Sequence, residues 1–251
     1  MKLFVCSDIH SSFFELEYSL KKSGYDSKNP NHKLIILGDL FDNGYHAKEV
    51  KDFVLKNKPL LIRGNHDDSL MRIYETGYIK KHDYTDGTFF TMQQLGNCFS
   101  ADTTKVLESF REKNKDLMSL YYNTPYYLVL DDILFVHAWA PKAEDIAEAT
   151  RDEWHKATLT NIQREIDLIK KGVLPNLYPY TLIKKIIFGH HKADALNGLE
   201  NYKGEGVHTE MIKTLKTNDF TLYGIDGRVQ LTRKIPMLIL EVKNDAGTKL
   251  R

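Results

Sequence analysis

Three short apolar runs near the start of the chain constrain the fold more than any other feature. They read KLFVCSD, KLIILGD and PLLIRGN, and each ends abruptly in polar residues, which is typical of a strand buried on both faces. The segments between them, FFELEYSLKKSGY and AKEVKDFVLKN, place apolar residues at helical spacing, and Gly24 and Pro59 act as stop signals. Strands that alternate with helices in this way indicate βαβ units and a parallel sheet.

The rest of the chain extends this pattern into a layered fold. Residues 68–123 read as helix and loop, with TTKVLESFREKNKDLMSLYY as the clearest helix, and Asp131-Asp132 joins two apolar runs into a predicted hairpin. A long helical segment from Ala143 to Gly172 follows. KKIIFGHH, FTLYGIDG, VQLTR and PMLILEVK then read as strands, the last three antiparallel. We expect an α/β sandwich of two mixed β-sheets flanked by helices. It would form one domain over 1–251, with 68–123 as a helical insertion over the site.

Composition narrows the class of protein. With 42% hydrophobic residues the chain can form its own core, and 35 Lys+Arg against 34 Asp+Glu argue against a dedicated nucleic-acid binder. Two cysteines, Cys6 and Cys98, make a poor disulfide framework. No leader is visible, and no apolar run approaches the roughly 18 residues that cross a bilayer. We therefore expect a cytoplasmic protein without a membrane or nucleic-acid partner. The sequence carries no signal for the oligomeric state.

Polar side chains that can bind a metal ion follow each of the strand-like runs. They are Asp8 and His10 after the first run, Asp39 after the second, Asn65 after the third, His137 after the hairpin and His190 after KKIIF. Because sites in α/β sheets form at the carboxyl ends of strands, we expect these residues to converge although they are spread along the chain.

This donor set indicates a pair of metal ions. Mixed oxygen and imidazole ligands suit Mn, Fe, Zn or Ni better than a pure oxygen cage for Ca or Mg, and we expect Mn first. Six ligands are too many for one catalytic ion with an open position, whereas they suit two ions about 3.5–4 Å apart. Asp8 and His10 would hold the first ion, and Asp39 would bridge. Asn65, His137 and His190 would hold the second.

Three further residues are candidates for catalysis. His66 directly follows a predicted ligand and can protonate a leaving-group oxygen as general acid. Asp42 can accept a hydrogen bond from that imidazole and hold its tautomer, although in the sequence DNG it also fits a turn. Arg63 can hold a phosphate with its guanidinium, although a structural salt bridge fits it equally well.

The ordered motifs DIH, GDLFDNG, RGNHD, FVHAW and FGHH resemble those of the calcineurin-like metallophosphoesterases. The form RGNHD is most similar to the serine/threonine protein phosphatase branch and its bacterial, phage and diadenosine tetraphosphatase relatives. The resemblance implies an αββα sandwich and two metal ions on the same six ligands. It also implies direct attack of a metal-bound hydroxide on phosphorus without a phosphoenzyme.

The chain departs from that family pattern at three positions. Asn43 stands where the protein phosphatases carry a phosphate-gripping arginine, Asp67 stands where many relatives have Glu, and Lys192 replaces the second histidine of a His-x-His pair. Arg63, Arg151 or Lys156 could replace the missing arginine.

We therefore predict a dinuclear metal-dependent phosphoesterase whose partner is a phosphorylated substrate, either a phosphoprotein or a small phosphoester or nucleotide. Hydrolysis of phosphomonoesters is the leading hypothesis. Hydrolysis of dinucleoside polyphosphates of the Ap4A type is the alternative, because Asn43 weakens the case for a protein phosphatase. A non-catalytic, metal-binding regulatory protein is the alternative of another class. Substrate choice would depend on residues 68–123, which carry no readable code.

Overall fold

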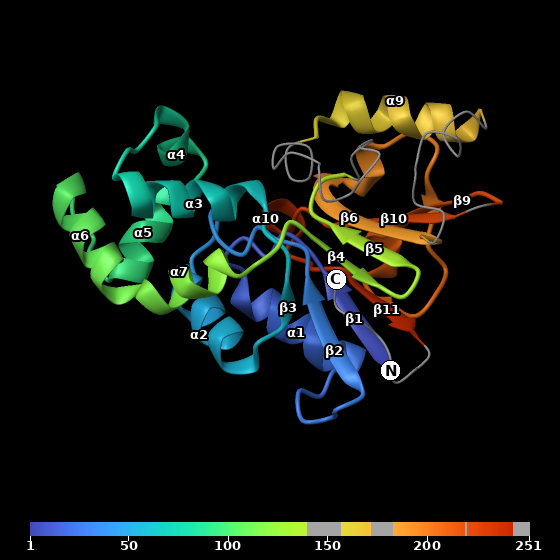
Figure 1. Ribbon diagram of the computed structural model, residues 1–251, viewed down its shortest axis with the longest axis horizontal. Helices are drawn as coiled ribbons and strands as arrows, with labels where there is room; N and C mark the ends of the chain where they lie inside the picture. The colour runs from blue at the N-terminus through green and yellow to red at the C-terminus, as the bar shows by residue number, and fades with distance from the viewer. Residues whose placement is uncertain (140–156, 172–182, 219, 243–251) are drawn as a thin grey trace.

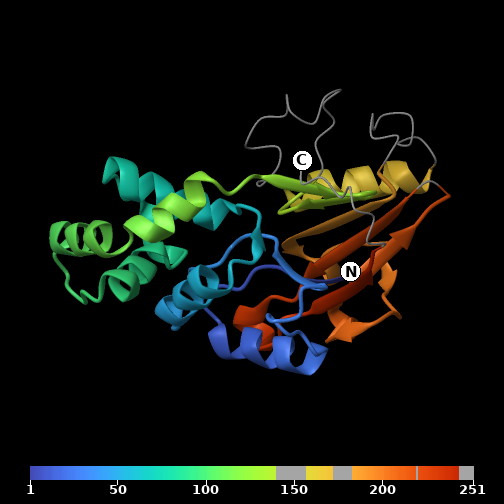
Figure 2. The same ribbon diagram turned by 60° about the horizontal axis from the view of Figure 1, so that its bottom comes forward.

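Two mixed β-sheets lie face to face in the computed structural model, with helices on their outer faces (Figures 1 and 2). The structure describes residues 1–139, 157–171, 183–218 and 220–242. Arg151, Lys156 and the first part of the helical segment predicted from Ala143 lie outside the described residues. The α/β sandwich of two mixed sheets predicted from the sequence is confirmed.

The first sheet contains the predicted βαβ units. Its strand order is β3-β2-β1-β11-β8. The members are β1 (Lys2–Cys6), β2 (His32–Ile36), β3 (Leu60–Leu61), β8 (Gly206–Val207) and β11 (Met237–Glu241). As predicted, β1 pairs in parallel with β2 and β2 with β3, through α1 (Phe13–Ser23) and α2 (Ala47–Asn57). Gly24 ends α1, as predicted, and it does so in a left-handed conformation.

The second sheet has the order β4-β5-β6-β10-β9-β7. Its strands are β4 (Tyr127–Leu130), β5 (Ile133–Val136), β6 (Lys185–Lys192), β7 (Glu200–Asn201), β9 (Lys213–Lys216) and β10 (Thr221–Asp226). The hairpin across Asp131-Asp132 is confirmed, since Leu130 pairs with Ile133. The last three predicted strands do not form one antiparallel group, because β10 and β11 lie in different sheets. β10 runs parallel to β6 and antiparallel to β9, and β11 runs antiparallel to β1 and β8.

Side-chain alternation builds the layers from these strands. Leu3 and Val5 of β1 pack between the sheets with residues of β5, β6 and β10, while Phe4 and Cys6 face the helices. On the far side, α9 (Leu159–Lys170) packs its apolar face on β5, β6 and β10. Figure 2 shows this succession from α9 through both sheets to α1.

Residues 68–123 are helical, as predicted. This part of the chain forms α3 (Asn65–Thr76), α4 (Lys81–Thr85), α5 (Thr88–Gly96), α6 (Thr103–Lys113) and α7 (Lys115–Tyr122), at the left of Figure 1. The prediction of one continuous helix over 103–122 was wrong. Asn114 leaves helical geometry and donates to the carbonyls of Leu95 and Phe110. The buried Lys51 ammonium of α2 donates to its side-chain oxygen at 2.9 Å, so a tertiary contact stabilises the break.

The strand prediction for VQLTR was also wrong, because Val229–Thr232 forms the short helix α10. The alternation of Val229 and Leu231 resembles a strand, but Val229 is buried and Leu231 is 69% exposed. Arg228 and Arg233 flank this single turn, both in left-handed conformations that end strand geometry.

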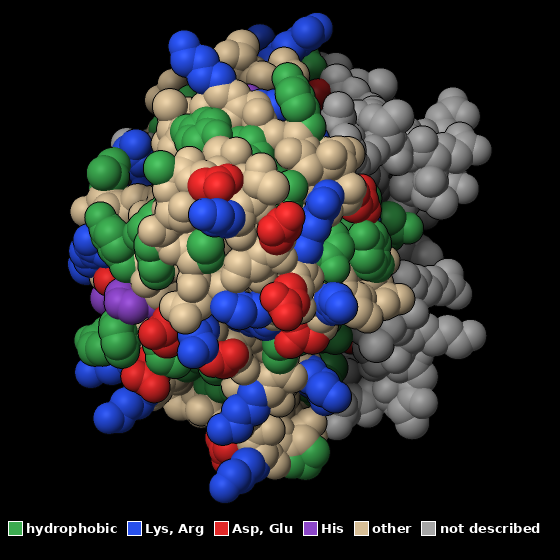
Figure 3. Space-filling view, turned by 90° about the vertical axis from the view of Figure 1, so that its left-hand side faces the viewer, with side chains coloured by type: hydrophobic (Ala, Val, Ile, Leu, Met, Phe, Trp, Pro, Cys, Tyr) green, Lys and Arg blue, Asp and Glu red, His purple; other side chains and the backbone are tan. Residues whose placement is uncertain are grey.

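Three smaller observations concern surface and environment. Cys6 and Cys98 are both unpaired, as expected, and Cys6 is buried. Among the described helices, none is long and apolar enough to cross a membrane. On the face shown in Figure 3, acidic and basic side chains are interspersed.

Candidate metal centre

All six predicted metal ligands lie together at the carboxyl ends of five strands, with His66 beside them. Two groups of possible ligand atoms form there, each with its members within 4.8 Å of one another, and Asp39 belongs to both. The first group is His10, Asp39 and His66, and the second is Asp39, His137 and His190. β1, β2 and β3 deliver residues from one sheet, and β5 and β6 deliver His137 and His190 from the other.

Glycine allows the loops after β2 and β3 to approach this closely. Gly38 has a φ of +87°, and a Cβ there would lie 2.5 Å from the Gly64 nitrogen and 2.9 Å from His137 Nδ1. A Cβ on Gly64 would overlap the Asp39 carboxylate. Both positions therefore require glycine for the two loops to meet.

The backbone at the site is strained. Five of the nine residues singled out from the sequence have positive φ, which costs a non-glycine residue about 1–2 kcal/mol each. They are Asp8, His10, Asp39, Asp42 and His190. Such clustering is typical of functional sites, where the surrounding structure maintains the strain.

The first group faces a shared carboxylate oxygen. His10 Nδ1 donates to the Phe41 carbonyl at 3.0 Å, which leaves the Nε2 lone pair 3.9 Å from both Asp8 Oδ1 and Asp39 Oδ2. The other carboxylate oxygen of Asp8, Oδ2, accepts hydrogen bonds from Ser7 Oγ and from the His190 backbone amide. Burial lowers the pKa of His10 to about 4, so this imidazole is neutral and able to coordinate an ion.

The second group is packed more tightly. His137 Nδ1 donates to the Leu37 carbonyl at 2.6 Å, so Nε2 points into the site. This nitrogen lies 3.1 Å from Asn65 Oδ1, 3.2 Å from His190 Nδ1 and 3.4 Å from Asp39 Oδ2. Burial, and then the charge of His137, lower the pKa of His190 to about 2, which keeps its lone pair free.

Electron-pair donors that face one another at these distances require a cation between them. Without a metal ion the cation is a proton. Burial opposes charge on His137, but the attraction and hydrogen bond of Asp39 outweigh it and raise its pKa to about 9. Burial likewise opposes ionisation of Asp39, yet the neighbouring histidines, led by His137, hold its pKa well below the usual range. The donor chemistry therefore fits divalent metal ions, which compete with protons for the same lone pairs.

His66 and Asp42 form the predicted pair. His66 Nδ1 donates to Asp42 Oδ2 at 2.8 Å, and Thr88 Oγ1 donates to the same oxygen at 2.6 Å. His66 Nε2 lies 4.0 Å from Asp39 Oδ2. Burial alone would lower the pKa of His66, but Asp39 and Asp42 raise it to about 10. The imidazole is therefore protonated at neutral pH and holds a proton on Nε2.

Asp67, noted in the sequence only as a departure, fixes the two loops. Its carboxylate accepts from the backbone amides of Asp39 and Gly64 at 2.9 Å and of Leu40 at 3.1 Å. Tyr121 of α7 donates to it at 2.6 Å. No sequence signal pairs Tyr121 with Asp67, because the two are distant in the chain.

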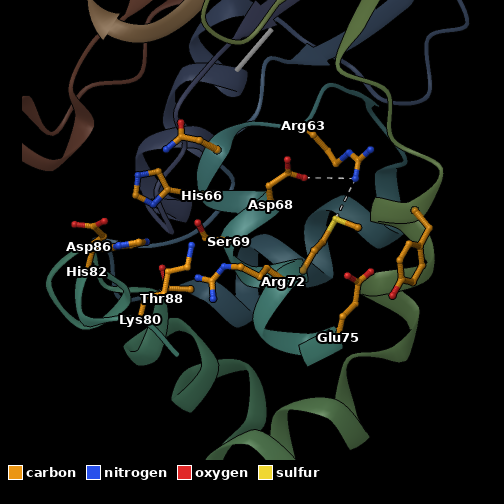
Figure 4. A pocket seen from close by; sticks show the side chains of 13 residues that line it. Arg63, His66, Asp68, Ser69, Arg72, Glu75, Lys80, His82, Asp86 and Thr88 are labelled. Atoms are coloured by element: carbon orange, nitrogen blue, oxygen red, sulfur yellow. Dashed lines mark hydrogen bonds and ion pairs between the residues drawn. The ribbon is translucent and has the colours of Figure 1, made fainter. Parts of the chain in front are cut away.

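Two cavities meet at His66. One, of about 500 Å³, includes the predicted ligands Asp8, His10, Asp39 and His190 in its wall. The other, of about 570 Å³, lies over α3 and α4, with Asn65 and Lys80 in its wall (Figure 4).

Arg63 lies in the second cavity and not in the first. Its guanidinium lies 3.5 Å from Asp68 and over the Tyr126 ring at 4.2 Å. The predicted phosphate contact of Arg63 stays a prediction. Asp226 and Arg228, in the wall of the first cavity, were missed. A signal was present, because they follow the strand-like run FTLYGID as the other site residues follow theirs.

The fold and this site define a class of protein, the calcineurin-like phosphoesterases. The family model of that name matches residues 1–223, and the chain belongs to this family. The resemblance seen in the motifs is thereby confirmed.

Individual relatives narrow the comparison. Over 146 residues the chain is 32% identical to the asymmetrical bis(5'-nucleosyl)-tetraphosphatase PrpE of Anoxybacillus flavithermus, covering 53% of this chain and 56% of that protein. The chain thus spans somewhat more than half the length of the curated relatives it matches.

Solved structures share the fold at low sequence identity. A structure described as a diadenosine tetraphosphatase superposes with a TM-score of 0.50 at 15% identity, covering 97% of this chain and 95% of that one. A serine/threonine phosphatase of Saccharomyces cerevisiae gives the same TM-score and identity over 100% and 82% of the two chains.

Proposed function

We propose that the protein is a dinuclear metal-dependent phosphoesterase that hydrolyses phosphomonoesters. The observation that carries this proposal is the convergence of six electron-pair donors, in two groups that share Asp39, next to a protonated His66. Asp8, His10 and Asp39 would hold one ion, and Asp39, Asn65, His137 and His190 the other. Family membership supports the reaction class.

In this reaction the chain's own residues position ions and move one proton. Bound divalent ions supply Lewis acidity that polarises a phosphoryl group and acidifies water. His66 Nε2 protonates the leaving oxygen as general acid, and Asp42 holds the ring so that Nε2 carries that proton. Asp67 keeps the loops of Asp39 and Gly64 in register, so the donor geometry exists before substrate binds.

The test uses two esters with different leaving groups. Protein loaded with Mn²⁺ is assayed on p-nitrophenyl phosphate and on phenyl phosphate, whose leaving oxygen is more basic and needs a proton more. We expect His66→Asn to reduce hydrolysis of phenyl phosphate by about 10²–10⁴-fold and of p-nitrophenyl phosphate less. His46→Asn is the control, because His46 is absent from the walls of both cavities.

Two results would contradict this proposal. Equal losses on both esters would remove the general-acid role of His66. Wild-type protein that binds two Mn²⁺ ions yet cleaves no ester would favour the non-catalytic regulatory protein.

A second candidate function is asymmetrical hydrolysis of dinucleoside tetraphosphates. The relatives named for that activity favour it, as does the cavity of about 570 Å³ beside His66. Because the general acid protonates the leaving oxygen, the leaving group lies on the His66 side. A cavity of this size can accommodate a nucleotide, whereas a phenol leaves most of it unused.

Lys80 provides the discriminating experiment. It borders the second cavity (Figure 4), whereas its neighbour Lys81 is exposed and absent from the cavity wall. If the leaving group is a nucleotide, Lys80→Ala raises KM for diadenosine tetraphosphate several-fold without changing KM for p-nitrophenyl phosphate. Lys81→Ala changes neither. Equal effects of Lys80→Ala and Lys81→Ala would contradict binding of a nucleotide in this cavity.

A further inference from the structure

The cavity that holds the predicted metal ligands contains one guanidinium with no assigned role. Arg228 follows β10 and lines this cavity together with Asp8, His10 and Asp39. It is the only Lys or Arg among the described residues of that wall. The sequence departs from the family pattern at Asn43, also in the wall, so the position that would carry a phosphate-gripping arginine offers only an amide.

The backbone around Arg228 is fixed, whereas its charge is not used. The Arg228 amide donates to Asp226 Oδ1 at 2.7 Å, and its carbonyl accepts from the Leu231 and Thr232 amides at 2.9 and 3.0 Å. The guanidinium makes no hydrogen bond or ion pair with any described part of the chain, in contrast to Arg63, which lies 3.5 Å from Asp68. A free cation in a wall with three carboxylates is available to an incoming anion.

We propose that Arg228 binds the phosphoryl group of the substrate and the phosphate product in this cavity. The inference rests on the proposed function and adds a residue that determines anion affinity. A phosphoryl group presents three terminal oxygens, and a guanidinium matches two of them through parallel N–H donors. The same wall holds the carboxylates of Asp8, Asp39 and Asp226, which repel an anion. Arg228 therefore adds a permanent positive charge for the substrate to that of the protonated His66 in this wall.

Arg233 is a matched control in the same turn. Like Arg228 it flanks α10 in a left-handed conformation, with φ of 55° against 51°. Its side chain is 62% exposed, lies 3.8 Å from Glu15, and is absent from the cavity wall. Alanine at either position keeps a Cβ and so leaves the backbone strain unchanged, and Arg233→Ala removes an exposed contact with Glu15 where Arg228→Ala removes the cavity contact.

The experiment measures binding of inorganic phosphate to the full chain loaded with Mn²⁺, by isothermal titration calorimetry. We expect Arg228→Ala to weaken binding about tenfold to a hundredfold, as for loss of charge-assisted hydrogen bonds. Arg228→Lys should lie between, and Arg233→Ala should bind as wild type does. Thermal unfolding of Arg228→Ala and Arg233→Ala should agree, which excludes a general folding defect.

Binding and turnover separate the two proposals. The role of Arg228 would be overturned by either of two results. In one, Arg228→Ala binds phosphate as tightly as wild type, and in the other, wild-type protein binds no phosphate. Loss of phosphate binding in Arg228→Ala together with no hydrolysis by wild type would overturn the proposed function and support this inference. In an active enzyme, Arg228→Ala should raise KM for p-nitrophenyl phosphate more than it lowers kcat.

Discussion

Replacement of Asp42 by Asn tests how the charge of His66 is maintained. The substitution keeps the size of a side chain with no exposed surface but removes its charge. Burial disfavours the charged form of His66, and the attraction of two carboxylates outweighs this effect. Asp39 Oδ2 lies 4.0 Å from His66 Nε2, and Asp42 Oδ2 lies 2.8 Å from His66 Nδ1. The rise in pKa from 6.5 to about 10 corresponds to about 5 kcal/mol in favour of the charged ring, at about 1.4 kcal/mol for each pKa unit.

The expected change follows from removing one of these carboxylates. An adjacent opposite charge shifts a pKa by about 1–3 units, so Asp42→Asn should lower that of His66 by about two. The alkaline limb of kcat/KM for phenyl phosphate then moves to lower pH. Activity falls up to about a hundredfold at pH values above both limbs and changes little at pH values below both. Bound ions that neutralise Asp39 lower the pKa of His66 in both proteins and leave this difference.

The assay is a pH profile from 6 to 10 with saturating Mn²⁺. Thr91→Val is the control, because Thr91 Oγ1 accepts a hydrogen bond from the Asp42 backbone amide at 3.1 Å. Loss of this hydrogen bond perturbs the loop without changing the Asp42 carboxylate. A uniform loss at every pH in Asp42→Asn would refute the reasoning. So would an equal displacement of the limb in Thr91→Val.

Four further predictions concern metal affinity and stability. Burial lowers the pKa of His137, but Asp39 outweighs burial and raises this pKa to about 9, so a metal ion must displace a proton from the ring. Apparent Mn²⁺ affinity, measured by calorimetry, should therefore fall about tenfold for each pH unit between 8 and 6. In metal-free protein this raised pKa stabilises the fold. The stabilisation is complete below pH 6.5 and is lost as pH rises through about 9, which urea unfolding at a series of pH values would detect. Lys51→Met should cost about 1–3 kcal/mol in urea unfolding, because the Asn114 oxygen loses its donor; an unchanged midpoint would contradict this. Gly64→Ala should abolish tight Mn²⁺ binding, whereas Gly24→Ala, with open space around its Cβ, should cost about 1 kcal/mol and leave binding intact.

The parts of the fold and site that could be predicted are those with local causes. Asp8, Asp39 and Asn65 follow strand-like runs, and the convergence of strand ends follows from parallel pairing alone. The hairpin at Asp131-Asp132 depends on adjacent residues, so it was also visible.

Long-range contacts account for the parts that were not predicted. The helix break at Asn114 depends on Lys51 in another helix, and the role of Asp67 depends on Tyr121. VQLTR alternates like a strand, but the conformations of Arg228 and Arg233 override that pattern. Arg228 follows a strand-like run as the other site residues do, but the pairing of β10 with β6, which brings it to the ligands, depends on contacts far apart in the chain.

The position of Asp39 has a consequence for how the protein unfolds. Its carboxylate lies between residues of both sheets, because it is close to His10, which follows β1 of one sheet, and to His137, which follows β5 of the other. Ions bound there would act as a cross-link between layers that otherwise adhere through apolar side chains. Amide protection in β1 and β6 should then rise together when metal is added, and the sheets should open as one cooperative unit.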